Sequence, residues 1–188
     1  MIIIIHGFGS AGMGGKAMLF REYFKDKNMA CIAPSLSYIP ELAMDTLEQI
    51  IEFCGGDEVK LIGSSLGGYY AIYLAEKYGL KAVLINPAVD STKTLKKRVE
   101  KMGGMAMNYH DNSLFTWNMN HVNMLKKYKV EEVKKGKYLL LLQKGDDVLD
   151  YKDAVAKLPD AQSIIEEGGT HPFNGIERYF RDIEDFLK

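Results

Sequence analysis

A chain of 188 residues has about the length of one domain and can bury a substantial core. Its 24 Lys and Arg and 25 Asp and Glu leave a net charge of −1, which offers no electrostatic attraction to nucleic acid or to anionic lipid. With 47% hydrophobic and 26% charged residues, the composition is that of a folded globular protein. We therefore expect no nucleic-acid partner.

Six short apolar runs, each bounded by Gly, Pro or Asn, alternate with segments of helical spacing, and this alternation predicts a parallel sheet. The runs cover Met1–Ile5, Met29–Ala33, Val59–Ile62, Lys81–Ile85, Tyr138–Gln143 and Gln162–Glu166. Runs such as Ile2–Ile5 do not alternate apolar with polar residues, so the strands should be covered on both faces. The pattern predicts an α/β fold over residues 1–188, with a doubly wound, mostly parallel sheet of about six strands.

Apolar stripes at helical spacing predict the helices that cover this sheet. One stripe consists of Ala43, Leu47, Ile50, Ile51 and Cys54 and is ended by Gly55–Gly56; a largely apolar helix is expected over Leu66 to Tyr78; and Phe173, Ile176, Phe180, Ile183 and Leu187 form a last stripe. The sheet should therefore have helices on both faces.

Residues 88–136 break the alternation of strands and helices. This interval holds five of the ten methionines and the only tryptophan, Trp117, without a clear strand. A long insertion of this kind is usually a lid or a disordered excursion, and its apolar content favours a lid, or cap. Met102, Met105, Met107 and Met119 with Trp117 suggest an adaptable apolar pocket for an acyl chain. Ordinary packing of a helical cap on the core is the alternative.

The sharpest local motif is Gly63-Ser64-Ser65-Leu66-Gly67, a Gly-x-Ser-x-Gly pattern between an expected strand and an expected helix. In that context the pattern indicates a nucleophile elbow, a sharp turn that lifts the Ser65 hydroxyl above the sheet. Gly63 and Gly67 are the small neighbours that such a turn needs. The start of the helix would aim N–H groups at a developing oxyanion. The alternative is a glycine-rich turn that binds phosphate or merely packs.

A serine nucleophile needs a base, and the chain has four histidines. His171 lies between the last strand and the last helix, where a serine hydrolase of this architecture places its base. His6 ends the first strand and is better interpreted as a supporting residue. His110 and His121 lie inside the insertion and are better explained as surface or lid residues. A loop histidine that satisfies a local hydrogen bond is the alternative for His171.

The loop after Tyr138–Gln143 offers Asp146, Asp147 and Asp150 as the acid that orients the histidine. Asp146 stands at the immediate end of the strand and is the choice, with Asp147 as the alternative. The order serine, aspartate, histidine along the chain is that of α/β-hydrolases.

An oxyanion hole needs two N–H groups, and we expect those of Leu66 and Phe8. Phe8 lies in the glycine-rich turn that follows the first strand, where Gly7 gives the chain room. Another tight turn between strand and helix is the alternative reading of this segment.

Together these motifs resemble the α/β-hydrolase superfamily, and most closely the small bacterial YqiA-type esterase family, a family of uncharacterised predicted esterases. The resemblance rests on His6-Gly7-Phe8, Ile62 to Ala71, Asn86 to Val89, Gly145 to Tyr151 and Glu167 to His171. It implies an esterase or thioesterase without metal or cofactor. In the family the second residue of the Gly-Asp pair motif can be glutamate, which favours Asp146 over Asp147. The stretch Ser91 to Lys135 departs from the family, so the substrate does not carry over.

The expected function is hydrolysis of a small carboxylic ester or thioester through an acyl-enzyme on Ser65. A hydrolase-fold binding protein without activity, or a serine hydrolase of lactones or peptides, is the alternative. Because Met1 already opens the first strand, we expect a minimal hydrolase core of six strands. Cys31 and Cys54 form no framework of disulfides and should be buried thiols in a reducing compartment. With no apolar stretch approaching the roughly 18–20 residues of a membrane span, the cytoplasm is the expected location.

Overall fold

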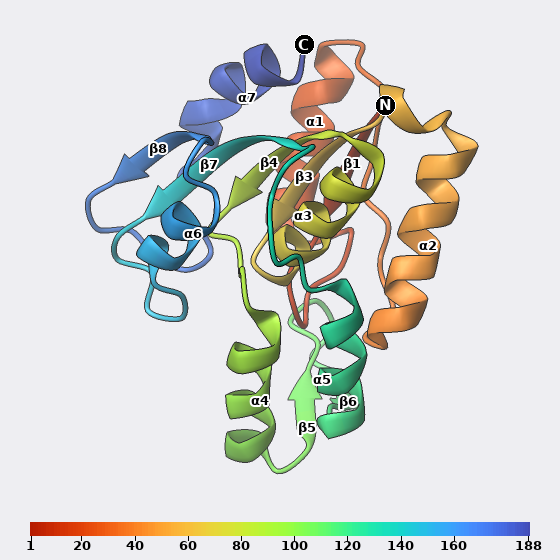
Figure 1. Ribbon diagram of the computed structural model, residues 1–188, viewed down its shortest axis with the longest axis vertical. Helices are drawn as coiled ribbons and strands as arrows, with labels where there is room; N and C mark the ends of the chain where they lie inside the picture. The colour runs from red at the N-terminus through yellow and green to blue at the C-terminus, as the bar shows by residue number, and fades with distance from the viewer.

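The computed structural model describes residues 1–188, except for the side chains of Asp57 and Met102. Six strands form one parallel sheet in the order β2-β1-β3-β4-β7-β8 (Figure 1). They are β1 (Ile2–Ile5), β2 (Cys31–Ile32), β3 (Lys60–Ser64), β4 (Lys81–Ile85), β7 (Lys137–Gln143) and β8 (Gln162–Glu166). The chain leaves β1 toward one edge of the sheet and leaves β3 toward the other. The switch point, where ligands bind in such sheets, therefore lies between β1 and β3.

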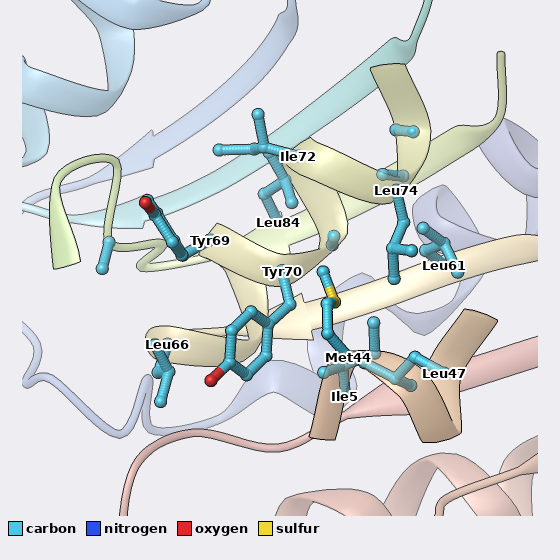
Figure 2. Packing of buried hydrophobic residues seen from close by; sticks show 14 of the residues in the cluster. Ile5, Met44, Leu47, Leu61, Leu66, Tyr69, Tyr70, Ile72, Leu74 and Leu84 are labelled. Carbon is cyan, nitrogen blue, oxygen red and sulfur yellow. The ribbon is translucent and has the colours of Figure 1, made fainter. Parts of the chain in front are cut away.

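Helices cover both faces of the sheet, as the apolar runs predict. Ile2 and Ile4 pack on one side with α1 (Gly15–Asp26) and α7 (Phe180–Leu187). Ile3 and Ile5 point to the other face. The elements on that face are α2 (Pro40–Phe53), α3 (Leu66–Tyr78) and α6 (Tyr151–Lys157). Figure 2 shows Met44 and Leu47 of α2 beside Ile5, with Tyr70 of α3 close by. Burial of both faces explains why the central strands β1, β3, β4 and β7 have apolar cores, whereas the edge strand β8 is largely exposed.

The segment of residues 88–136, which we call the insertion, contains structure that the sequence does not reveal. It holds α4 (Ser91–Met102), an antiparallel pair formed by β5 (Met105–Met107) and β6 (Leu114–Thr116), and α5 (Met119–Leu125). In Figure 1 these elements lie together below the sheet. The expectation of no clear strand here was wrong, because strands of three residues carry too little pattern to be recognised.

Two other expectations need correction. The stripe that begins at Phe173 is not one helix: Phe173 has φ 61°, and a 3-10 turn over Ile176–Tyr179 precedes α7. Cys31 and Cys54 are free thiols but only half-buried, because Cys31 lies on the edge strand β2 and Cys54 ends α2. The strand expected over Met29–Ala33 is shorter than predicted, because β2 lies at the edge of the sheet and pairs with β1 alone.

No helix in the described part of the chain combines the length and the apolar character that crossing a bilayer requires. A further 3-10 turn, Gly56–Glu58, leads from α2 into β3, and another, Lys126–Tyr128, follows α5.

The end of the insertion is fixed to the core by Glu76 of α3. Its carboxylate accepts hydrogen bonds from the N–H groups of Lys134, Lys135 and Gly136 at 2.7, 2.9 and 2.8 Å. It also accepts one from the Tyr138 hydroxyl at 2.6 Å. Burial alone would raise the pKa of Glu76, but these four bonds outweigh it and hold the pKa below its ordinary value. The ionised carboxylate therefore anchors the chain where it returns to β7.

We expect Glu76→Ala to lower the free energy of unfolding by about 1–3 kcal/mol at pH 7, because several donors lose a charged acceptor. The folded pKa is depressed, so this stabilisation is present above the unfolded value of about 4.3 and is lost as pH falls through the folded pKa. Urea unfolding should show that the difference in free energy of unfolding between wild type and variant decreases at acidic pH. The control is Glu132→Ala, whose exposed partner is Lys134 and whose cost should stay within about 0.5 kcal/mol. Equal losses of unfolding free energy in the two variants would contradict the anchoring role of Glu76.

Candidate active site

A sharp turn joins β3 to α3 and presents Ser65. This residue has φ 55° and ψ −120°, and residues other than glycine rarely adopt a positive φ. Its N–H donates to the carbonyl of Ile85 at 3.2 Å, and its carbonyl accepts from the N–H of Ala88 at 3.0 Å. A Cβ on Gly67 would lie 2.0 Å from the Ile5 carbonyl oxygen, and one on Gly63 would lie 2.4 Å from the Gly67 oxygen. The two glycines of the motif are therefore required by close backbone approach.

Three side chains that are far apart in sequence form a hydrogen-bonded chain. The Oγ of Ser65 lies 2.9 Å from Nε2 of His171, and Nδ1 of His171 lies 2.8 Å from Oδ2 of Asp146. The side chain of His171 is 21% exposed and that of Asp146 is 3% exposed, so the histidine meets solvent while the carboxylate is shielded. In this arrangement an imidazole can take the proton of a serine hydroxyl while a carboxylate fixes its tautomer.

Asp146 is held as an ionised acceptor. Its Oδ1 accepts the N–H groups of Val148 and Leu149 at 2.8 and 2.9 Å, while Oδ2 faces His171. Burial alone would raise the pKa of Asp146, but the bond to His171 and the two backbone bonds outweigh it and lower that pKa. Asp147 is exposed and has no such contacts among the described residues. The geometry thus places Asp146, the first of the two candidates, beside His171.

The His171 loop is held in place by two polar residues, Asn86 and Gln143, whose roles were not predicted from the sequence. Nδ2 of Asn86 donates to the carbonyls of Thr170 and His171 at 3.0 and 3.1 Å, and its Oδ1 accepts from the N–H of Gln143 at 2.9 Å. The Thr170 N–H donates to Oε1 of Gln143 at 3.0 Å. Both side chains are buried at strand ends, Asn86 after β4 and Gln143 at the end of β7. A polar residue that ends an apolar strand is the signal that could have found them.

His6 supports the loop after β1 and does not contact Ser65 in the described hydrogen-bond network. Its Nε2 accepts the N–H of Leu36 at 2.9 Å, so its proton sits on Nδ1, which donates to the Gly7 carbonyl at 2.9 Å. Burial lowers the pKa of His6, in keeping with this neutral form. A Cβ on Gly7 would lie 3.1 Å from Cβ of Ser65, so the loop passes close to the serine.

The two backbone groups predicted to form the oxyanion hole lie on this loop and at the start of α3. Neither the Phe8 N–H nor the Leu66 N–H has a hydrogen-bond partner among the residues described. Unpaired N–H groups beside a serine hydroxyl are what an oxyanion requires.

A family model matches the whole chain, residues 1–188, and its description is "uncharacterised protein family (UPF0227)". The chain belongs to the UPF0227 family. A UPF0227 protein of Vibrio cholerae is 24% identical over 190 residues, which cover 99% of this chain and 98% of the relative. Among solved structures, mouse alpha/beta hydrolase domain-containing protein 10 superposes with a TM-score of 0.77 at 18% identity, covering 100% of this chain and 90% of the other. A monoacylglycerol lipase of Paleococcus ferrophilus superposes with a TM-score of 0.74 at 18% identity, covering 99% of this chain and 93% of the other. The fold is that of the α/β-hydrolases.

Two cavities meet at Ser65 and His171. The α1-side cavity, about 270 Å³, lies on the face of the sheet that α1 covers and reaches Lys16 and Phe20. The insertion-side cavity, about 400 Å³, is bounded by α4 and the Asp146 loop and reaches Arg98. In the described part of the chain, no cluster of three His, Cys, Asp or Glu side chains is arranged to hold a metal ion.

The insertion packs directly on the loop that carries Phe8. The Phe8 ring lies 4.8 Å from Trp117 and 5.6 Å from Phe115, measured between ring centroids. The Tyr109 N–H donates to the Gly9 carbonyl at 2.7 Å. The loop and the insertion therefore share one small aromatic core.

The expectation of a methionine-lined pocket was wrong for the three named methionines whose side chains are described. Met105, Met107 and Met119 line neither cavity, and Trp117 is buried against Phe8 and His121. The side chain of Met102 lies outside the described residues. Aromatic and aliphatic side chains line the insertion-side cavity instead: Phe8, Leu66, Leu95, Tyr109 and Leu149. The alternative, ordinary packing of the insertion on the core, accounts for the tryptophan.

Proposed function

We propose that the chain is a serine hydrolase that cleaves small carboxylic esters or thioesters through an acyl-enzyme on Ser65. The observation that carries the proposal is the hydrogen-bonded chain Ser65–His171–Asp146. Its serine lies on a strained turn between β3 and α3. The order of the three residues in the sequence is that of α/β-hydrolases, and one solved neighbour of this fold is a monoacylglycerol lipase.

In the first half of the reaction, Oγ of Ser65 attacks the ester carbonyl while Nε2 of His171 takes its proton. Asp146 holds the Nδ1–H and stabilises the imidazolium that forms. The tetrahedral intermediate then collapses, the bond from carbon to the leaving oxygen or sulfur breaks, and His171 returns the proton to the leaving group. Water, deprotonated by the same histidine, releases the acyl group and restores the serine.

The oxyanion of each intermediate would be held by the N–H groups of Phe8 and Leu66. Neither donor has a hydrogen-bond partner among the described residues, and the dipole of α3 adds positive potential at its first turn. His6 and Gly7 support this role by fixing the loop and by letting it approach the serine.

The insertion would act as a cap within a single hydrolase domain of residues 1–188. It forms a wall of the insertion-side cavity through α4 and Tyr109, above Ser65. A cap in this place excludes water from the reacting carbonyl and shapes the substrate pocket.

A fluorophosphonate probe tests the proposal, because it bonds covalently to an activated serine and not to an ordinary one. We expect stoichiometric labelling of the folded protein, with the added mass on the peptide that contains Ser65. Ser65→Ala should abolish labelling, whereas Ser64→Ala, which removes the neighbouring hydroxyl, should still be labelled. Folded protein that stays unlabelled would favour the alternative of a hydrolase-fold binding protein. A panel of p-nitrophenyl esters, thioesters, lactones and peptides then assigns the bond that is cleaved.

A further inference from the structure

A lysine that the mechanism does not use lies inside the α1-side cavity. Lys16 is in the first turn of α1, and its Nζ donates a hydrogen bond to Oγ of Ser64 at 2.8 Å. Ser64 immediately precedes the proposed nucleophile, and both serines line this cavity together with Lys16. Within the described part of the chain, no carboxylate forms an ion pair with this ammonium, and its one hydrogen-bond partner is a neutral hydroxyl. At least one of its three donor positions is therefore open.

The backbone around Lys16 adds to the positive potential. Gly14 is the N-cap of α1 and provides no side chain to cap the first N–H groups of the helix. Gly14, Gly15 and Lys16 all line the cavity, so the positive end of the helix dipole and the ammonium act on the same space. The sheet side of the cavity is apolar, with Ile4 and Ile62.

No carboxylate lines the α1-side cavity, so the charge of Lys16 is compensated only in part. Burial lowers the pKa of Lys16 to about 8, and the charge of Asp146 opposes this shift without cancelling it. The ammonium is still largely protonated at pH 7. A half-buried cation of this kind is stabilised when an anion binds beside it.

We infer that Lys16 is a specificity-determining residue, and that the α1-side cavity receives a carboxylate on the substrate. The preferred substrate is then an ester that also carries one ionised carboxylate, separated by a short chain from the ester group that is cleaved. This inference rests on the proposed function for its reaction, but the anion site itself does not depend on turnover. The volume of about 270 Å³ fits a small group, and the apolar wall suits the methylenes that join the two carbonyl carbons.

Matched substrates test the inference, because a methyl ketone has nearly the shape of a carboxylate without its charge. One pair, monomethyl glutarate and methyl 5-oxohexanoate, places the charge on the acyl side. The other pair, 4-acetoxybutanoate and 4-oxopentyl acetate, places it on the alcohol side. We expect kcat/KM for the carboxylate to exceed that for the ketone by about 10- to 100-fold in one of the pairs, the range of a hydrogen-bonded charge.

Three variants assign that preference. Lys16→Met should bring the ratio of the two kcat/KM values close to 1, mainly through KM for the carboxylate, whereas Lys16→Arg should restore part of the ratio. Lys25→Met, on the exposed side of the same helix, should leave the ratio as in the wild type. A wild-type ratio near or below 1 in both pairs, or a ratio that survives Lys16→Met, would overturn the inference.

Calorimetry with glutarate separates this inference from the proposed function. In a Ser65→Ala background, which cannot turn over, glutarate should bind about 10-fold more weakly or worse when Lys16→Met is added. Binding through Lys16 without hydrolysis of any ester would remove the proposed function and leave the anion site. Hydrolysis of neutral esters without glutarate binding would do the reverse. Binding of inorganic phosphate but not of glutarate would overturn the assignment to carboxylates.

Discussion

Ser65→Ala should lower kcat for ester hydrolysis by about 10⁶-fold, because the variant loses the atom that forms the acyl-enzyme. A residual rate of roughly 10³–10⁴ over water is expected if the N–H groups of Phe8 and Leu66 still bind the oxyanion. The fold should be retained, since the hydroxyl of Ser65 contacts His171 alone in the described hydrogen-bond network. Steady-state kinetics with a p-nitrophenyl ester, on protein purified from a host lacking interfering esterases, measures the loss.

Ser64→Ala is the matched control for this measurement. It removes the adjacent hydroxyl, which bonds to Lys16, and leaves the proposed nucleophile in place. We expect it to lose less than about 10-fold on a neutral ester. A purified Ser65→Ala protein that hydrolyses at the wild-type rate would refute the assignment of the nucleophile. The same loss in both variants would point to damage of the turn rather than of the chemistry.

Asp146→Asn should lower kcat by about 10⁴-fold without disturbing the fold. The ionised carboxylate accepts the Nδ1–H of His171 and so keeps Nε2 free to accept the proton of Ser65. An asparagine can turn its amide N–H toward Nδ1, which favours the tautomer with the proton on Nε2. That tautomer cannot act as a base toward the serine. The kinetic assay used for Ser65 measures this effect as well.

Asp147→Asn distinguishes the two aspartates that the sequence leaves as alternatives. Its side chain is exposed, so we expect a loss far smaller than that of Asp146→Asn. Equal losses, or a near wild-type rate in Asp146→Asn, would contradict the proposed role of Asp146. Circular dichroism of both variants checks that neither loss reflects unfolding.

The sequence was most informative where the fold imposes a simple rule. Parallel strands that are buried on both faces must be apolar throughout, so runs such as Ile2–Ile5 identified the sheet. The carboxyl ends of these strands share one edge, and the residues that follow β3, β7 and β8 are therefore neighbours in space. That rule, with the glycine spacing around Ser65, predicted His171 and Asp146 as its partners, with Asp147 as the alternative, and the structure places His171 within hydrogen-bond distance of both Ser65 and Asp146.

The sequence failed where a side chain's partner is set by tertiary contact. The sequence marks Asn86 and Gln143 only as polar residues at the ends of apolar strands, and the assembled sheet is needed to show that they bind the carbonyls and an N–H group of the His171 loop. Lys16 and Ser64 are 48 positions apart and share no motif. The β5–β6 pair is formed by strands of three residues, too short for a period to emerge.

Phe8 belongs to two structural units at once. Its backbone lies in the loop after β1 and carries one of the N–H groups proposed to hold the oxyanion, while its ring is packed with Trp117 and Phe115 of the insertion. An insertion transplanted from a relative would therefore need its own aromatic partners for this ring. Without them the loop would lose the packing of the Phe8 ring against Trp117 and Phe115. In this chain, a redesign of the insertion would therefore also alter the packing of a loop that the proposed mechanism uses.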